Sequence, residues 1–153
     1  MTSSEFFKII EYITQNCRDL KNKYISEDLK IDYVCIFSKS QKEFDELLKF
    51  ASSIGELAEQ TKTGPVFKLN NSPDTIIGKP KMLKIRIPDK TRLERGDVDF
   101  NTDYENFKKK YLDNKRFTLI KRDNFEMLEL RDNSFDVLVY FSSIPLSEQL
   151  GVN

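Results

Sequence analysis

Apolar residues recur every three to four positions in three stretches of the chain, which predicts amphipathic helices there. The stretches are residues 3–22, 40–55 and 102–112. Ser3 or Ser4 is the expected cap of the first helix. Ser40-Gln41-Lys42-Glu43 and Thr102-Asp103-Tyr104-Glu105 have the sequence of a capping box, which favours a helix start at each place.

Alternating or β-branched runs between these helices predict strands. They lie at residues 31–37, 56–61, 65–70, 82–87, 97–100, 117–121, 125–130 and 135–141. The turn Lys62-Thr63-Gly64 joins the strands at residues 56–61 and 65–70 into a hairpin. Pro88 ends the strand at residues 82–87. We expect a loop over residues 71–78 and a loosely ordered tail after Ser142.

The predicted elements repeat one order, strand-helix-strand-strand-strand, without repeating the sequence. The N-terminal helix and its connection occupy residues 1–30, a first βαβββ module residues 31–88, and a second module residues 96–142. We therefore expect an α+β chain whose residues 1–153 form a single domain.

Composition narrows the classes of partner. Lys and Arg number 25 and Asp and Glu 25, so the zero formal net charge argues against nucleic acid and a membrane surface as partners. No apolar run approaches the roughly 18 residues that a membrane span needs. The N-terminal residues show no signal-peptide pattern, so we expect a cytoplasmic protein with Cys17 and Cys35 as buried free thiols.

The chain contains no histidine, and this excludes several kinds of site. A Ser-His-Asp triad, a Cys-His dyad and a histidine-liganded metal all need an imidazole. Two widely separated cysteines are a poor basis for a zinc site.

The order of elements and several short motifs resemble the vicinal-oxygen-chelate superfamily, which is glyoxalase- and dioxygenase-like, and within it the YecM-like branch. The motifs are Ile31-Asp32-Tyr33-Val34, Gly55-Glu56-Leu57, Phe67-Lys68-Leu69, Ile85-Arg86-Ile87-Pro88 with the Gly96 segment, and Val137-Leu138-Val139-Tyr140-Phe141. The resemblance covers roughly residues 31–145. It implies a curled mixed sheet, a half-barrel, with helices on its outer face, and it implies a homodimer.

The positions at which that family holds a metal carry other residues here. Tyr33 stands where a histidine is expected, Arg86 where a glutamate is expected, and Asp99 where a second histidine is expected. A guanidinium cannot ligate a cation, since it stays protonated and has no acceptor. We therefore expect neither the metal of this family nor another cofactor.

Candidate binding residues follow from strand parity around residues 84–100. Lys84 and Arg86 alternate with Leu83, Ile85 and Ile87, so they should face away from the helices. Cations on a concave sheet face favour an anionic ligand, which an arginine can hold with two hydrogen bonds. The candidate ligand-binding residues are Tyr33, Lys68, Lys84, Arg86, Arg95, Asp99 and Tyr140. The alternative is that Lys84 and Arg86 lie on a solvated face or pair with carboxylates.

Three further clusters have both a functional and a structural interpretation. Arg92, Glu94, Arg95, Asp97 and Asp99 suggest a mutually paired loop in which Gly96 permits a turn, a ligand-gripping rim, or an acidic site for Mg²⁺ or Ca²⁺.

Glu126 and Glu129 lie on opposite faces of one strand, so only one of them can point inward. That one is a candidate general base or an ion-paired carboxylate. The lysines around residues 108–122 fit a solvated face better than a nucleic-acid site, because acidic residues interrupt them.

The sequence thus favours a metal-free protein that binds a small anionic molecule on the concave sheet face. One alternative is a protein-interaction or structural module that uses the charged loop at residues 89–99. A weaker alternative is a metal-independent lyase or isomerase with Glu126 or Glu129 as base. Whether the protein is an enzyme stays open at this point.

Overall fold

The fold is taken from a computed structural model, which describes residues 1–152. In chain order the elements are α1 (Ser3–Tyr24), β1 (Ile31–Phe37), α2 (Gln41–Ile54), β2 (Gly55–Thr61), β3 (Gly64–Leu69), β4 (Met82–Arg86), β5 (Gly96–Phe100), α3 (Tyr104–Tyr111), β6 (Phe117–Lys121), β7 (Glu126–Leu130), β8 (Val137–Ser142) and α4 (Leu146–Gln149). Every strand expected from the sequence is present, with its ends shifted by at most a few residues.

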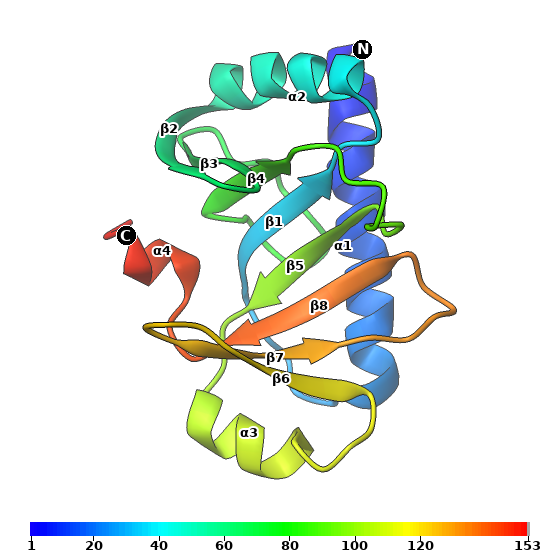
Figure 1. Ribbon diagram of the computed structural model, residues 1–153, viewed down its shortest axis with the longest axis vertical. Helices are drawn as coiled ribbons and strands as arrows, with labels where there is room; N and C mark the ends of the chain where they lie inside the picture. The colour runs from blue at the N-terminus through cyan, green and yellow to red at the C-terminus, as the bar shows by residue number, and fades with distance from the viewer. Residues whose placement is uncertain (153) are drawn as a thin grey trace.

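The strands form one mixed sheet in the order β2-β3-β4-β1-β5-β8-β7-β6 (Figure 1). Each half has the same arrangement, because β1 pairs with β4 in parallel just as β5 pairs with β8. The halves meet where β1 and β5 run antiparallel. The sheet is curled and does not close, since β2 and β6 remain at its two edges. This confirms the predicted α+β fold of two βαβββ modules with an additional N-terminal helix.

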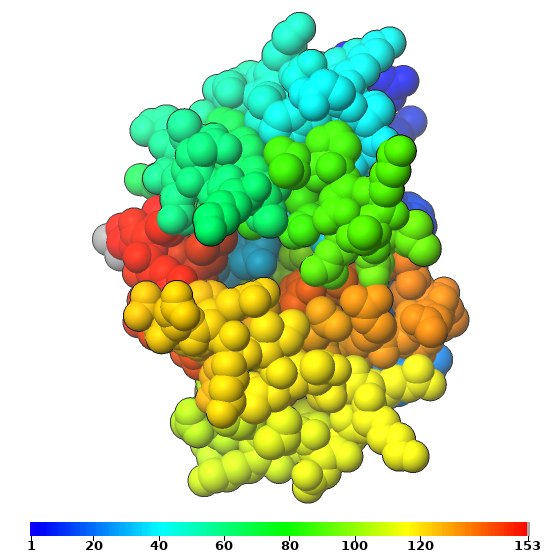
Figure 2. Space-filling view, in the orientation of Figure 1, coloured from blue at the N-terminus to red at the C-terminus, as the bar shows by residue number. Residues whose placement is uncertain are grey.

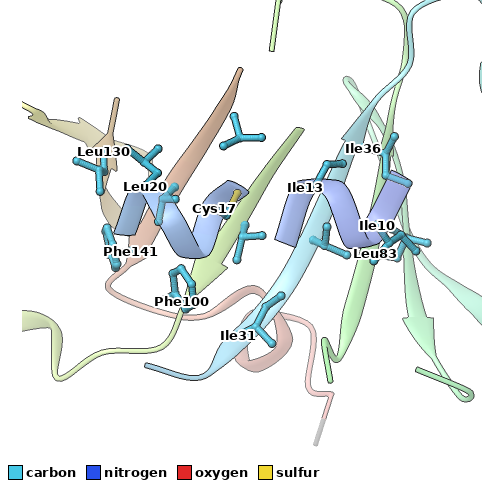
Figure 3. Packing of buried hydrophobic residues seen from close by; sticks show 14 of the residues in the cluster. Ile10, Ile13, Cys17, Leu20, Ile31, Ile36, Leu83, Phe100, Leu130 and Phe141 are labelled. Atoms are coloured by element: carbon cyan, nitrogen blue, oxygen red, sulfur yellow. The ribbon is translucent and has the colours of Figure 1, made fainter. Parts of the chain in front are cut away.

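The helices α1, α2 and α3 cover one face of this sheet. α1 lies along β1, β5 and β8 at the centre, while α2 and α3 lie toward the two ends (Figure 1). Figure 3 shows α1 residues against strand residues such as Ile36, Leu83 and Phe141. Burial of these apolar side chains is the main favourable term for the fold, at roughly 25 cal/mol for each Å² removed from water. The opposite face of the sheet is left without a helix along its centre.

Side chains along each strand point alternately toward the helices and toward the concave face, as helices on one face of the sheet require. Val34 and Ile36 of β1, Val98 of β5 and Val139 of β8 are fully buried beneath the helices. Their sequence neighbours therefore project from the concave face. Leu83 and Ile85 follow the same rule and belong to the helix-side core, as predicted. Ile87 lies beyond the end of β4 and is 41% exposed.

The helix starts differ in part from the sequence predictions. Thr2, rather than Ser3 or Ser4, caps α1, and it forms a complete capping box with Glu5. Ser40 caps α2 as expected, but the Glu43 carboxylate accepts from the backbone of Lys39 instead of Ser40. The third expected box does not form. Asp103 takes the cap position of α3 without a side-chain hydrogen bond.

The segment after Ser142 is ordered, contrary to the expectation of a loose tail. It forms the short helix α4, which docks on β1 through the buried side chains of Ser147 and Asp32. The Ser147 backbone donates to Asp32 Oδ2 at 3.0 Å, and its hydroxyl donates to Asp32 Oδ1. This pair explains the burial of a carboxylate on β1. Over residues 1–152, none of the helices is both long and apolar enough to span a membrane.

Gly96 has a role other than the turn expected from the sequence. It lies in β5, and a Cβ placed there would lie 2.2 Å from the carbonyl oxygen of Cys35 and 2.7 Å from Cδ1 of Ile13. The glycine therefore allows β1, β5 and α1 to approach closely at the junction of the two halves.

Replacing Gly96 tests the importance of this contact. We expect Gly96→Ala to lower the free energy of unfolding by about 1–3 kcal/mol, because the added methyl group overpacks a closed site. Urea denaturation followed by circular dichroism measures the change. Ser52→Ala, at an exposed position of α2, is the control and should have little effect. Equal stability of Gly96→Ala and the control would contradict the close packing.

Candidate functional site

The concave face of the sheet encloses a cavity of about 310 Å³. Its lining comes from the side chains that alternate with the helix-side core. They are Tyr33, Cys35 and Phe37 of β1, Val66 of β3, Lys84 and Arg86 of β4, Asp97 and Asp99 of β5, Met127 of β7, Tyr140 and Ser142 of β8, and Thr61, Thr63, Arg92, Arg122, Phe125, Leu146 and Gln149 around the rim. In Figure 2 the surface is hollowed between the red C-terminal segment, the green residues of the first half and the yellow β6–β7 hairpin.

Strand register arranges the polar residues in two rows across the centre of the sheet. In one row Tyr33 of β1 is the partner of Asp99, and Asp99 is the partner of Tyr140. In the other row Cys35 lies between Lys84 on β4 and Asp97 on β5. The two halves therefore each contribute to one site at their junction.

The cations of the site are only weakly neutralised. The Arg86 guanidinium lies 3.4 Å from the Asp89 carboxylate and 5.5 Å from the centre of the Phe37 ring. Its buried Nε has no hydrogen-bond partner among residues 1–152. Within the same residues no carboxylate forms a salt bridge with Lys84 or Arg92. Arg86 and its neighbours thus have donor capacity directed at the cavity.

Two buried carboxyl groups face these cations. Asp97 is 5% exposed, and its Oδ1 has no hydrogen-bond partner in the described part of the chain. Burial raises the pKa of Asp97 to about 7, although Lys84, Arg86 and Arg92 act in the opposite direction. Asp99 accepts hydrogen bonds from the backbone and hydroxyl of Ser142. Burial nevertheless raises the pKa of Asp99 well above its usual range. The site therefore carries more positive than negative charge at neutral pH.

Hydroxyl and thiol groups complete the polar lining. Tyr140 donates to Glu129 Oε2 at 2.7 Å, and burial raises its pKa far above the usual range. Burial likewise raises the pKa of Tyr33 and of Cys35, with the charge of Asp97 adding to both shifts. Both tyrosines remain neutral donors at physiological pH. Cys35 is a free thiol, as is Cys17, and it stays protonated.

Apolar side chains and the C-terminal helix also line the cavity, and two of these side chains, Phe37 and Val66, lie beside Arg86 and Lys84. Phe37, Val66, Phe125 and Met127 line it from the strands, and Leu146 lines it from the start of α4. The bond between Ser147 and Asp32 holds α4 in this position. The cavity can therefore take a molecule that carries both a charged group and an apolar group.

Five of the seven predicted ligand-binding residues line this cavity. They are Tyr33, Lys84, Arg86, Asp99 and Tyr140. Lys68 is exposed and lies beyond Val66 along β3, outside the lining. Arg95 also lies outside it, because its guanidinium donates to Glu43 at 2.6 Å and to the carbonyl oxygen of Phe37 at 2.9 Å.

The two candidate general bases do not line the cavity either. Glu126 pairs with Lys108 of α3 at 2.9 Å, on the helix side of the sheet. Glu129 accepts a hydrogen bond from Tyr140 and lies 3.3 Å from Arg131. It therefore acts on the cavity only through the Tyr140 side chain, which it holds in place. The two glutamates have opposite orientations, as their spacing predicts.

The charged loop is not paired with itself, which corrects that interpretation. Arg95 pairs with Glu43 of α2, and Glu94 pairs with Arg131 beyond β7 at 2.6 Å. Arg92, Asp97 and Asp99 instead line the cavity. The loop therefore ties the two halves together and contributes to the site.

The predicted ligand-binding residues left out Ser142 and Arg122, and Arg92 and Asp97 were considered only as members of the charged loop. Parity gives a signal for two of them, because Asp97 shares a face with Asp99, and Ser142 shares a face with Tyr140. Arg92 and Arg122 lie in connections, where alternation predicts no direction. Their position depends on the curl of the sheet.

The donor set does not fit the metal of the family that the sequence resembles. Arg86 occupies one of the three expected ligand positions, and burial raises the pKa of both Tyr33 and Asp99, which opposes the anionic form that binds a metal ion. No group of three or more acidic, cysteine or histidine residues within residues 1–152 is arranged to hold a metal ion. Asp97 and Asp99 alone, beside three cations, are a poor site for Mg²⁺ or Ca²⁺.

Comparison with known proteins adds to the description of the fold. No protein-family model and no curated protein matches the sequence. One solved structure, described as "Structural Genomics, Protein EC4020", is similar over 97% of this chain and 91% of its own, with a TM-score of 0.71 and 12% identity. At that identity the similarity concerns the fold alone.

A glyoxalase/bleomycin resistance protein/dioxygenase superfamily member from Vibrio splendidus 12B01 matches more weakly. It covers 74% of this chain and 97% of its own, with a TM-score of 0.47 and 6% identity. This second similarity is too low to bear on the fold or the site.

Asp97 gives the site a measurable pH dependence. Because its pKa is about 7 in the folded protein and near 4 in the unfolded chain, the folded state holds the proton longer as pH rises. Stability is therefore lost between about pH 4 and pH 7. We expect Asp97→Asn to melt several degrees above the unsubstituted protein at pH 8, with little difference at pH 4.5. An equal difference at both pH values in thermal unfolding experiments would contradict the perturbed carboxyl.

Proposed function

We propose that this protein binds a small molecule with a carboxylate or phosphate group in the concave cavity, without a metal ion. The observation that carries the proposal is Arg86, which lines the cavity and whose buried Nε has no hydrogen-bond partner among residues 1–152. A buried donor left unpaired costs about 1–3 kcal/mol, and an oxyanion removes that penalty. Arg86 also has the planar donor arrangement that fits carboxylate and phosphate oxygens.

The charge of the lining supports an anion over a cation. Lys84, Arg86, Arg92 and Arg122 contribute four positive charges. The opposing carboxyls are Asp97 and Asp99, and burial raises the pKa of both, that of Asp97 to about 7, which reduces their negative charge at neutral pH. Low solvent access strengthens the remaining field, because charges interact more strongly where water is excluded.

The arrangement favours ligand binding over the two alternatives. Arg95 and Glu94 of the charged loop are engaged within the chain, which leaves less of the loop as a docking surface. Glu126 and Glu129 lie outside the cavity, so neither is placed to take a proton from a molecule bound there. The size of the cavity, about 310 Å³, suits a metabolite rather than a peptide.

Several finer expectations from the sequence stay predictions beside this proposal. They are the YecM-like resemblance, the single domain, the cytoplasmic location and the homodimer.

A thermal-shift screen tests the proposal, because a ligand that binds the folded state raises its melting temperature. The probes are inorganic phosphate, phenyl phosphate, phenylacetate and, as a cationic control, benzylamine. We expect the anions to stabilise the protein and benzylamine to have no effect. Arg86→Ala should weaken the binding of a stabilising anion at least about tenfold, since a charged hydrogen bond contributes about 1.5–3 kcal/mol.

Lys49→Ala is the matched control, since it removes one positive charge from the exposed surface of α2, away from the cavity. Its affinity for the anion should equal that of the unsubstituted protein. Anion binding that survives Arg86→Ala, or that falls equally in Lys49→Ala, would show that the site lies elsewhere.

A further inference from the structure

We infer that the ligand of this cavity is a 2-hydroxy acid with an apolar substituent, whose oxyanion binds Arg86 and Lys84 and whose hydroxyl group binds Asp97. This inference rests on the proposed function and names the class of ligand. It follows from a second unpartnered group in the cavity, from the spacing of that group relative to the cations, and from the apolar side chains of the lining.

Asp97 is the second group. Its Oδ1 is buried and without a hydrogen-bond partner, although the residue lines the cavity. Buried polar atoms are nearly always hydrogen-bonded, so an exception at a cavity needs an explanation. Asp99, on the same face of β5, already has Ser142 as its partner. Asp97 is thus the carboxyl with capacity left for a ligand.

The register of the strands sets how far the ligand must reach. Lys84 and Asp97 flank Cys35 on neighbouring strands, so their backbones lie about 10 Å apart at two strand spacings. Cys35 lies between them, and the charges of both Lys84 and Arg86 act on Asp97. An oxyanion held by Lys84 and Arg86 therefore lies near Asp97. A hydroxyl group on the carbon next to the oxyanion meets this spacing.

The cations near Asp97 favour a ligand with a neutral hydroxyl group beside this carboxyl over a ligand with an ammonium group there. Asp97 is surrounded by Lys84, Arg86 and Arg92, whose charges act directly on it. The other titratable groups that act on Asp97 or feel its charge are Glu129, Asp99, Cys35, Tyr33, Tyr140 and, from α1, Cys17. An amino acid would bring a further positive charge to within a few ångströms of three cations. A neutral hydroxyl can donate to Asp97 or accept from it without that repulsion.

The apolar side chains of the lining account for the rest of the ligand. Phe37, Phe125, Met127 and Leu146 lie around the same cavity as the charged residues. An aromatic or branched substituent on the 2-carbon can bury its surface there, at roughly 25 cal/mol for each Å² removed from water.

Isothermal titration calorimetry at pH 7.5 with matched acids tests the inference. Phenylacetate and the two enantiomers of mandelate differ only by the 2-hydroxyl group. We expect one mandelate enantiomer to bind at least about tenfold more tightly than phenylacetate, as one hydrogen bond to a charged group predicts. Phenylglycine, with an ammonium in place of the hydroxyl, should bind more weakly than mandelate. Benzylphosphonate and its 1-hydroxy derivative repeat the comparison, and the tighter-binding series identifies the oxyanion as carboxylate or phosphate.

Asp97→Ala should abolish the preference for the hydroxyl while leaving the affinity for phenylacetate nearly unchanged. If the alanine variant is unstable, Asp97→Val is tested in its place, because valine is similar in size to aspartate. Asp45→Ala, at an exposed site on α2, is the control and should keep the preference. A preference that survives both Asp97 variants, equal affinities for the hydroxy and plain acids in both series, or tighter binding of phenylglycine would overturn the inference. Failure of all these acids to bind would overturn the proposed function and the inference with it.

Discussion

The site depends on one constraint, which is that α1, α2 and α3 cover one face of the sheet, while only the short helix α4 borders the cavity on the other face. Residues that alternate along each strand must then divide between a helix-packed core and a concave surface. Val34, Val98 and Val139 secure the covered face beneath α1. Their neighbours Cys35, Asp97 and Leu138 are thereby directed to the other side, whatever their polarity. The burial of apolar residues under α1 thus fixes the direction of the polar residues in the cavity.

The same constraint places the charged side chains of Asp97 and Arg86 where some of their polar atoms lack hydrogen-bond partners. Asp97 is held at the junction of the two sheet halves, where Gly96 allows β1 and β5 to approach closely. Neither Asp97 Oδ1 nor Arg86 Nε finds a partner within residues 1–152, although both line one cavity. Unpaired buried donors and acceptors lower stability. Both unpaired atoms are accounted for if the cavity binds a molecule that pairs with Asp97 and with Arg86.

The sequence predicted the fold well because the fold follows from local patterns. The alternation of Leu83 and Ile85 with Lys84 and Arg86 was enough to place both cations on the concave face. The C-terminal helix was missed because its position depends on one long-range pair, Ser147 with Asp32, and not on a periodic pattern. Arg95 was expected in the site, but its partner Glu43 lies on α2, 52 residues earlier in the chain. Contacts of that range follow from the curl of the sheet, which local patterns do not specify.

The position of a bound oxyanion is the most direct test of the proposed site. A crystal structure of the protein with mandelate locates it. We expect the carboxylate within about 3.2 Å of both the Arg86 guanidinium and Lys84 Nζ, which is hydrogen-bonding distance, with the phenyl ring against Phe37 and Met127. A carboxylate bound on the outer surface, or a cavity closed by direct pairing of Arg86 with Asp97, would contradict the account.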